Sequence, residues 1–149
     1  IQTLGRTVSP RVHFVNILLG HHGWPTAQRT GRGKFTPCPL CNSHNDTMHH
    51  ILSCHIVKEV VTDLMGASHQ DHIKSLLLFC DREPSTENIV LAALINFAVY
   101  TICNTARHSG HGSVSPTLIR DHASAAAEGT PAFPIWLQAV RASQVTRRA

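Results

Sequence analysis

The sequence contains few carboxylates and few aromatic side chains. Only nine of its 149 residues are Asp or Glu, and Phe, Trp and Tyr together make up 5% of the chain. It has no His-Glu-x-x-His zinc-protease motif, no Gly-x-Ser-x-Gly nucleophile turn and no phosphate-binding P-loop. A cytidine-deaminase centre is excluded too, because no His/Cys-x-Glu precedes the Cys-x-x-Cys pair. The sequence therefore predicts a protein that is not an enzyme.

Long hydrophobic runs and strand patterns are scarce as well. The most apolar stretch, Ile89 to Cys103, is about fifteen residues long and includes Asn96 and Thr101. A membrane-spanning helix needs about 20 apolar residues, so this stretch predicts a central helix that is buried on nearly all sides. The sequence shows neither an alternating strand pattern nor an internal repeat.

Cysteine is present at five positions, but the spacing is not that of a disulfide framework. Three cysteines fall within seventeen residues, whereas Cys80 and Cys103 lie in apolar helical runs, where a free cysteine is usually a small buried hydrophobe. We therefore expect an intracellular, reducing compartment, with the nucleus and the mitochondrion both open. The chain begins with Ile rather than Met, so an upstream targeting peptide also stays open.

The three clustered cysteines predict a structural zinc site. Cys38-Pro-Leu-Cys41 is a Cys-x2-Cys pair, and a polar loop separates it from the segment His49-His50-Ile-Leu-Ser-Cys54. Two thiols in a tight turn, with a His and a Cys about one helical turn apart, can close a tetrahedron around Zn²⁺. The predicted ligands are Cys38, Cys41, His50 and Cys54.

The histidine ligand can be chosen by helix geometry. Side chains at positions i and i+4 of a helix lie about 40° apart on one face, whereas those at i and i+5 lie about 140° apart. If one helix carries both ligands, His50 pairs with Cys54 better than His49 does. His49 is the alternative ligand, and His55 is a further candidate.

The order of the motifs carries a resemblance to a known family. The elements are Phe14, the run Ile17 to Gly23, a basic spacer, the Cys38–Cys41 pair, and Asp46-Thr47-x-x-His50-Ile51-Leu52 before Cys54. This order, over about residues 12–66, resembles the zinc-binding region that follows the polymerase domain in non-LTR retrotransposon reverse transcriptases. The common closing spacing of that family is His-x4-Cys, which His49 satisfies and His50 does not.

The resemblance implies a nucleic-acid-binding role without polymerase activity. In retrotransposon proteins the similar region holds template RNA or target DNA beside the catalytic core. This chain has no counterpart of the metal-binding carboxylates of the polymerase. A stand-alone chain of this kind would be a domesticated version of the zinc region.

The positive charge is concentrated at the two ends of the chain. Formal net charge is +4 with neutral His, and the first 34 residues contain five cations and no acid. The segment from Arg29 to Phe35 alternates cations with glycine, a composition that lets backbone N–H groups and side chains approach one phosphate. Trp24 and Phe35 flank it, and these rings either stack on unpaired bases or pack under the loop. The predicted nucleic-acid contacts are Arg11, Arg29, Arg32, Lys34, Arg147 and Arg148. A solvated loop is the plain alternative.

Apolar spacing, caps and breakers predict an all-α fold of about six helices. The first follows Ser9-Pro10, the second runs from Asp46 or Thr47 to Gly66 with the zinc ligands in its first two turns, and the fourth contains Ile89 to Cys103. One compact domain is expected. Its segments are the basic N-terminal helix and loop (1–37), the zinc knuckle and helix (38–66), the helical core (67–110), and the C-terminal helices with a basic tail (111–149).

These observations favour a zinc-stabilised module that binds RNA or another nucleic acid, as a subunit of a ribonucleoprotein assembly such as a ribosome. One alternative is a target- or template-binding fragment of a retroelement polyprotein. Another is a protein–protein scaffold in a large complex, in which the apolar helices dock on a partner. Neither a membrane span nor a small-molecule substrate is expected.

Overall fold

The computed structural model describes residues 4–31, 35–68, 73–80, 84–109 and 114–146, and within them it is built from helices without strands. The helices are α1 (Leu4–Thr7), α2 (Pro10–Gly20), α3 (Ala27–Thr30), α4 (Met48–Ile51), α5 (His55–Met65), α6 (Ile73–Leu77), α7 (Thr86–Ser109), α8 (Pro116–Ala127) and α9 (Phe133–Thr146). The predicted all-α class is confirmed. The predicted number of about six helices is wrong, because the described residues contain nine. The three additional helices arise because α1 and α3 were not predicted and because the predicted second helix is divided into α4 and α5.

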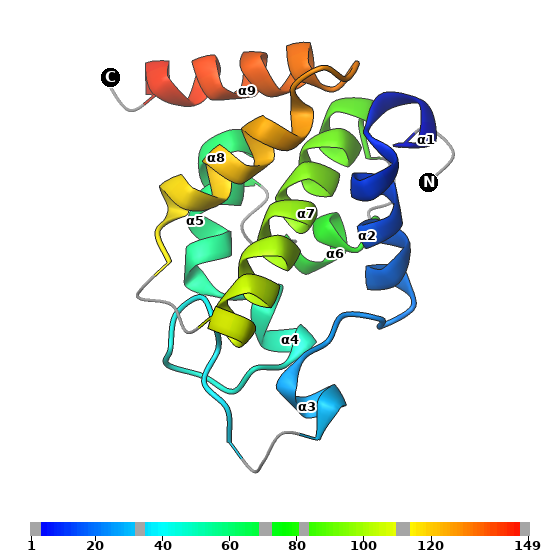
Figure 1. Cartoon of the computed structure of the whole chain (residues 1–149). Helices are drawn as coiled ribbons and strands as arrows, with labels where there is room; N and C mark the ends of the chain where they lie inside the picture. The colour runs from blue at the N-terminus through cyan, green and yellow to red at the C-terminus, as the bar shows by residue number, and fades with distance from the viewer. Residues whose placement is uncertain (1–3, 32–34, 69–72, 81–83, 110–113, 147–149) are drawn as a thin grey trace.

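Helix α7 is the centre around which the other long helices pack. It contacts α1, α2, α5, α6, α8 and α9, and Figure 1 shows it running through the middle of the fold. Its buried residues include the unbroken run from Val90 to Asn96, which covers every side of the helix. A helix that is apolar all round is a core helix, so the prediction of a buried central helix is confirmed.

Helix α7 extends beyond its apolar stretch at both ends. The helix has 24 residues, because polar turns at both ends extend the apolar stretch. Among the described helices it has the length and hydropathy that a membrane span requires, and 61% of its apolar window is buried inside the fold. The argument that the segment is too short to span is therefore wrong, and its burial is the observation that identifies it as a core element.

Local signals set the ends of several helices. The Ser9 hydroxyl accepts a hydrogen bond from the Val12 N–H at the start of α2, and Ser115 does the same for Leu118 at the start of α8. In both helices a proline follows the capping serine, where its missing N–H costs nothing. Gly66, with φ of 93°, ends α5 as predicted.

A pair of buried asparagines joins the central helix to its neighbours. The Asn96 amide donates to the Asn16 side-chain oxygen and to the Leu77 carbonyl, both at 2.9 Å. The Asn16 amide in turn donates to the carbonyls of Val12 (2.8 Å) and Ala93 (3.1 Å). Because buried polar groups must be hydrogen-bonded, these bonds fix how α2, α6 and α7 meet.

The asparagine pair predicts a specific loss of stability. Asn96→Ala leaves the Asn16 oxygen and the Leu77 carbonyl without this donor, so the free energy of unfolding should fall by about 1–3 kcal/mol. Asn88→Ala, at a partly exposed position on the same helix, is the control and should change it by less than half as much. Chemical denaturation of both variants is the measurement. If Asn96→Ala had the same free energy of unfolding as Asn88→Ala, the asparagine pair would not be what holds the helices together.

Candidate metal centre

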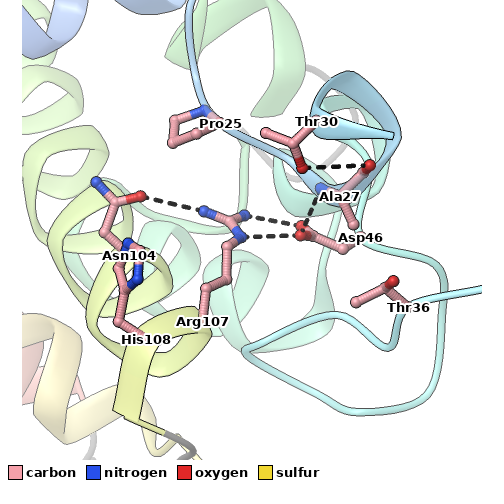
Figure 2. Close-up of a pocket in the computed structure, with 8 residues that line it drawn as sticks. All are labelled: Pro25, Ala27, Thr30, Thr36, Asp46, Asn104, Arg107 and His108. Carbon is pink, nitrogen blue, oxygen red and sulfur yellow. Dashed lines mark hydrogen bonds and ion pairs between the residues drawn. The ribbon is translucent and has the colours of Figure 1, made fainter. Parts of the chain in front are cut away.

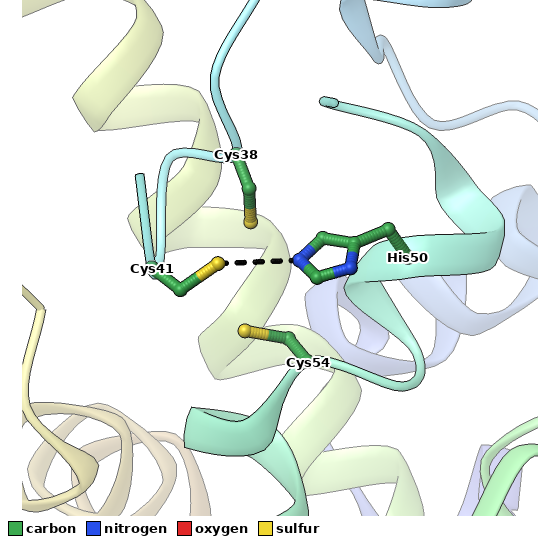
Figure 3. A group of neighbouring side chains, drawn as sticks. All are labelled: Cys38, Cys41, His50 and Cys54. Atoms are coloured by element: carbon green, nitrogen blue, oxygen red, sulfur yellow. Dashed lines mark hydrogen bonds between the residues drawn. The ribbon is translucent and has the colours of Figure 1, made fainter. Parts of the chain in front are cut away.

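Four side chains from the predicted zinc motif converge on one point. One ligand atom each from Cys38, Cys41, His50 and Cys54 lies within 4.8 Å of all the others, as Figure 3 shows. The Cys41 Sγ and His50 Nε2 atoms are 3.3 Å apart. A tetrahedral zinc ion with its usual bond lengths places ligand atoms about 3.5–3.8 Å from one another. The group can therefore hold a metal ion with only small side-chain adjustments.

A tight turn presents the first two thiols. The Cys38 N–H donates to the His44 carbonyl at 2.6 Å, and the Asn42 N–H donates to the Cys38 carbonyl at 2.9 Å. Asn42 has φ of 56°, a left-handed conformation that asparagine tolerates better than most residues. An isolated bridge between Pro37 and Asn45 closes the base of this turn. The thiols consequently point to the same side of a compact loop.

The other two ligands come from two helices and not from one. Helix α4 is capped by the Thr47 hydroxyl, which accepts from the His50 N–H at 3.0 Å, and it ends at Ile51. Cys54 immediately precedes α5 and has an extended backbone, with φ of −58° and ψ of 135°. The structure includes His50 in the group, as predicted, but the argument from one continuous helix is wrong. The helix is interrupted between the two ligands, after Ile51, and this interruption brings the Cys54 thiol close to the other three ligand atoms.

The alternative histidines lie away from the four ligands. His49 is exposed, and its Nε2 atom lies 2.7 Å from the Lys74 Nζ atom of α6. His55 is exposed at the start of α5. His44 was not considered from the sequence, yet its ring stacks on the His50 ring with centroids 4.5 Å apart and planes 16° apart. It holds the plane of the ligand imidazole.

Two of the thiols share a proton before a metal enters. The Cys54 thiol donates a hydrogen bond to Cys38, which lowers the pKa of Cys38 to about 5 in spite of its burial. The same hydrogen bond, together with desolvation, raises the pKa of Cys54. The hydrogen bond thus makes Cys38 the more acidic thiol of the pair. Metal entry displaces the proton from Cys54, as is general for thiolate sites.

The two remaining cysteines behave differently from each other. Cys103 is fully buried in α7, and burial raises its pKa, so it stays a neutral thiol. This agrees with the expected role of a small buried hydrophobe. The same expectation is wrong for Cys80, which is exposed because α6 ends at Leu77, before the cysteine.

A buried carboxylate ties the metal loop, residues 38–54, to the rest of the fold. Asp46 is fully buried, and the Arg107 guanidinium donates to both of its oxygens at 2.8 Å. The Ala27 N–H donates to Asp46 Oδ2 at 2.9 Å, and Arg107 also donates to Asn104 at 3.3 Å (Figure 2). Burial works to lower the pKa of Arg107, but the bonds and charge of Asp46 outweigh it and raise that pKa. The guanidinium remains charged, and the pair joins three segments of the chain.

Sequence reasoning missed this ion pair. The sequence marks Asp46 as part of the resemblance motif and, with Thr47, as a possible cap of the second helix, and the structure assigns that cap to Thr47. Arg107 was not singled out at all. The two residues are 61 positions apart, so no local pattern connects them, and only the packing of α7 against the metal loop brings them together.

The predicted nucleic-acid contacts fall into two groups. Arg11 is exposed on α2, and Arg29 is exposed on α3, where its guanidinium donates to the Gly23 carbonyl at 2.6 Å. Phe35 is exposed over 64% of its surface. The other four predicted contacts lie outside the described residues: Arg32, Lys34, Arg147 and Arg148.

Trp24 does not have the environment expected for a base-stacking residue. It is only 2% exposed, and its indole N–H donates to the Val15 carbonyl at 3.2 Å. Its ring packs against Tyr100 of α7, with centroids 5.4 Å apart. The prediction that Trp24 stacks on unpaired bases is therefore wrong. Trp24 instead anchors the loop after α2 to the core.

Over the residues that the structure describes, the fold is all-helical and the site is a Cys3His group that could hold a metal ion. Comparison with protein-family models, with curated proteins and with solved structures finds no match to this chain. The resemblance to the retroelement zinc region consequently rests on the motif residues alone.

The site predicts an asymmetric dependence of metal content on the two neighbouring histidines. Cys41→Ser and His50→Ala each remove one of four converging ligands, so the purified protein should lose most of its metal and the local fold with it. His49→Ala is the matched control and should keep a full equivalent. Metal analysis of the three proteins tests this. Retention of metal by His50→Ala with loss in His49→Ala would show that the wrong histidine is placed in the centre.

The Asp46–Arg107 pair predicts a second effect on stability. Asp46→Asn leaves a mostly buried guanidinium without its counter-charge, and breaking such a pair typically costs about 3–5 kcal/mol. Asp63→Asn breaks the more exposed Asp63–Arg120 pair and should cost less. The measurement is the free energy of unfolding of both variants and of the wild type, each with metal bound. A cost for Asp46→Asn no larger than that of the control would contradict the structural role of Asp46.

Proposed function

We propose that this chain is a non-enzymatic, zinc-stabilised RNA-binding module that serves as a subunit of a ribonucleoprotein assembly such as a ribosome. The observation that carries the proposal is the connection between the metal loop and the basic segment. Asp46 follows the Cys38–Cys41 turn and holds the Ala27 backbone, two residues before Arg29. Folding of the metal loop thereby positions the start of the basic segment, which runs from Arg29 to Phe35 and contains three cations within six residues.

Zinc is the ion that the ligand set favours. Three cysteines and one histidine, with ligand atoms within 4.8 Å of one another, are a typical ligand set for Zn²⁺, and soft sulfur ligands disfavour calcium and magnesium. All four positions around the centre are filled by side chains, whereas catalytic zinc sites keep a position for water. This closed arrangement supports a structural role for the metal.

Exposed cations and an exposed aromatic ring support RNA as the partner. Arg11 and Arg29 face solvent, and the first 34 residues contain no acid to compete with phosphate. Most of the affinity of such surfaces comes from phosphate contacts. Phe35, at 64% exposure, can stack on a base that is not paired, and proteins use this mode mainly with single-stranded or irregular RNA.

The resemblance to retrotransposon reverse transcriptases supports a derivation from their zinc region. A reading frame that continues upstream into a polymerase would instead identify the chain as part of a retroelement polyprotein that binds target or template. The three thiolate ligands require reducing conditions. An intracellular compartment is therefore part of the proposal, either the nucleus or the mitochondrion.

A protein–protein scaffold is the second candidate, because one face of α2 is apolar and exposed. Phe14 is 59% exposed and Ile17 is 37% exposed on this helix. Exposed apolar side chains that adjoin one another can mark a surface for another protein.

The salt dependence of RNA binding tests the proposed function. Replacing Arg29, Arg32 and Lys34 together with alanine should weaken binding to every sequence alike, because phosphate contacts do not read bases. The slope of log affinity against log salt should become shallower by about two to three, since each lost contact contributes about 0.7–0.9. Lys58→Ala on α5 is the control and should leave the slope unchanged.

Two outcomes would contradict the proposal. Absence of RNA binding by the metal-loaded wild type at low salt would leave the scaffold as the better account. Identical slopes for wild type and triple variant would show that the basic segment does not contact phosphate.

A further inference from the structure

A cavity of about 180 Å³ lies between α3 and the C-terminal end of α7. Asn104, Arg107 and His108 of α7 line one side, and Pro25, Ala27 and Thr30 lie opposite, as Figure 2 shows. The cavity is thus built from the central helix and from the segment that the metal loop holds in place. Arg29, an exposed cation, lies on the same short helix as Ala27 and Thr30.

The Arg107 guanidinium forms a fixed planar surface in this cavity. Its Nε and one terminal nitrogen donate to the two oxygens of Asp46, and its other terminal nitrogen donates to Asn104. Bonds on these edges fix the orientation of the plane, and the side chain lines the cavity. A guanidinium plane is one of the surfaces on which proteins stack unpaired RNA bases.

The charge of the cavity favours an uncharged ring over a phosphate. Asp46 pairs with Arg107 through both oxygens, so their charges compensate and a phosphate would meet little net attraction. Asn104 accepts from Arg107 through its oxygen, which leaves its amide nitrogen as a donor for a base carbonyl or ring nitrogen. Pro25 and Ala27 add apolar surface. These groups match a planar heterocycle with a polar edge.

The volume limits the ligand to a single ring system. Sites for drug-sized molecules measure about 300–1,000 Å³, and this cavity is smaller. We propose that it receives one unpaired base of a bound RNA, stacked on Arg107, while exposed cations such as Arg29 contact the neighbouring phosphates. This inference rests on the proposed function and specifies how the RNA is held.

A cavity-filling substitution tests the inference. Thr30→Phe puts an aromatic ring at the cavity and leaves the metal ligands, Asp46 and Arg107 unchanged. The affinity for a short single-stranded RNA of mixed sequence should fall about tenfold, within the range known for one stacked base. The salt slope should not change, because no phosphate contact is lost. Thr117→Phe, which lines a different cavity between α8 and α9, is the matched control and should bind as wild type does.

An abasic series locates the base with the wild-type protein and so does not depend on how a variant folds. Each nucleotide of the RNA is replaced in turn by one that lacks its base but keeps its phosphate. One position should show the same tenfold loss, and Thr30→Phe should add no further loss there, because both changes remove one interaction.

The outcomes separate the two proposals. Tenfold loss with an unchanged slope and non-additivity at one position supports the base site. Two results overturn the base site and leave the RNA-binding function intact. One is salt-dependent RNA binding with equal affinity for wild type and Thr30→Phe. The other is that Thr30→Phe adds its full loss of affinity to that of the abasic change at every position of the RNA. Failure of the metal-loaded wild type to bind the RNA at low salt overturns both.

Discussion

The buried carboxylate of Asp46 is the contact on which the arrangement of the metal loop depends. A charge without solvent must be compensated by several donors, and Asp46 obtains them from the Ala27 backbone and the Arg107 guanidinium. Those donors belong to the segment after α2 and to the central helix. A metal ion bound to the Cys38–Cys54 group would close the loop that carries Asp46. The four converging ligands and the ion pair thus hold the same loop from two sides.

The central helix provides the rigid frame for this contact. Helix α7 contributes Asn96 to the buried polar bridge near its middle and Arg107 to the ion pair near its end. Since the helix is surrounded by apolar neighbours along most of its length, the two polar contacts set its rotation and its register. Small domains gain little from propensity alone, and here packing and two buried polar clusters specify the structure.

Patterns that are local in sequence were the predictable part of this structure. The Cys38–Cys41 spacing, the Ser9-Pro10 and Ser115-Pro116 starts and the apolar run of α7 each depend on neighbouring residues only. The break between α4 and α5 was hidden, because Ile51, Leu52 and Ile56 continue an apolar helical spacing across it. The convergence of His50 and Cys54, on separate elements, overrides that spacing.

Contacts between distant segments could not be predicted. Nothing near Asp46 in sequence points to Arg107, and nothing near Trp24 shows that its indole reaches Val15 and Tyr100. His50 was chosen for a geometric reason that the structure contradicts, while His44, which stacks on it, has no distinguishing spacing. These contacts result from tertiary packing between distant segments, so no spacing pattern in a single sequence predicts them.

The dependence of RNA affinity on the metal tests the account most directly. Removal of the metal from the full chain by a chelator should release the loop that carries Asp46, disorder the segment around Arg29 and abolish most RNA binding, and addition of Zn²⁺ should restore it. RNA binding that is the same before chelation, after chelation and after zinc return would contradict the link between the metal centre and the basic segment.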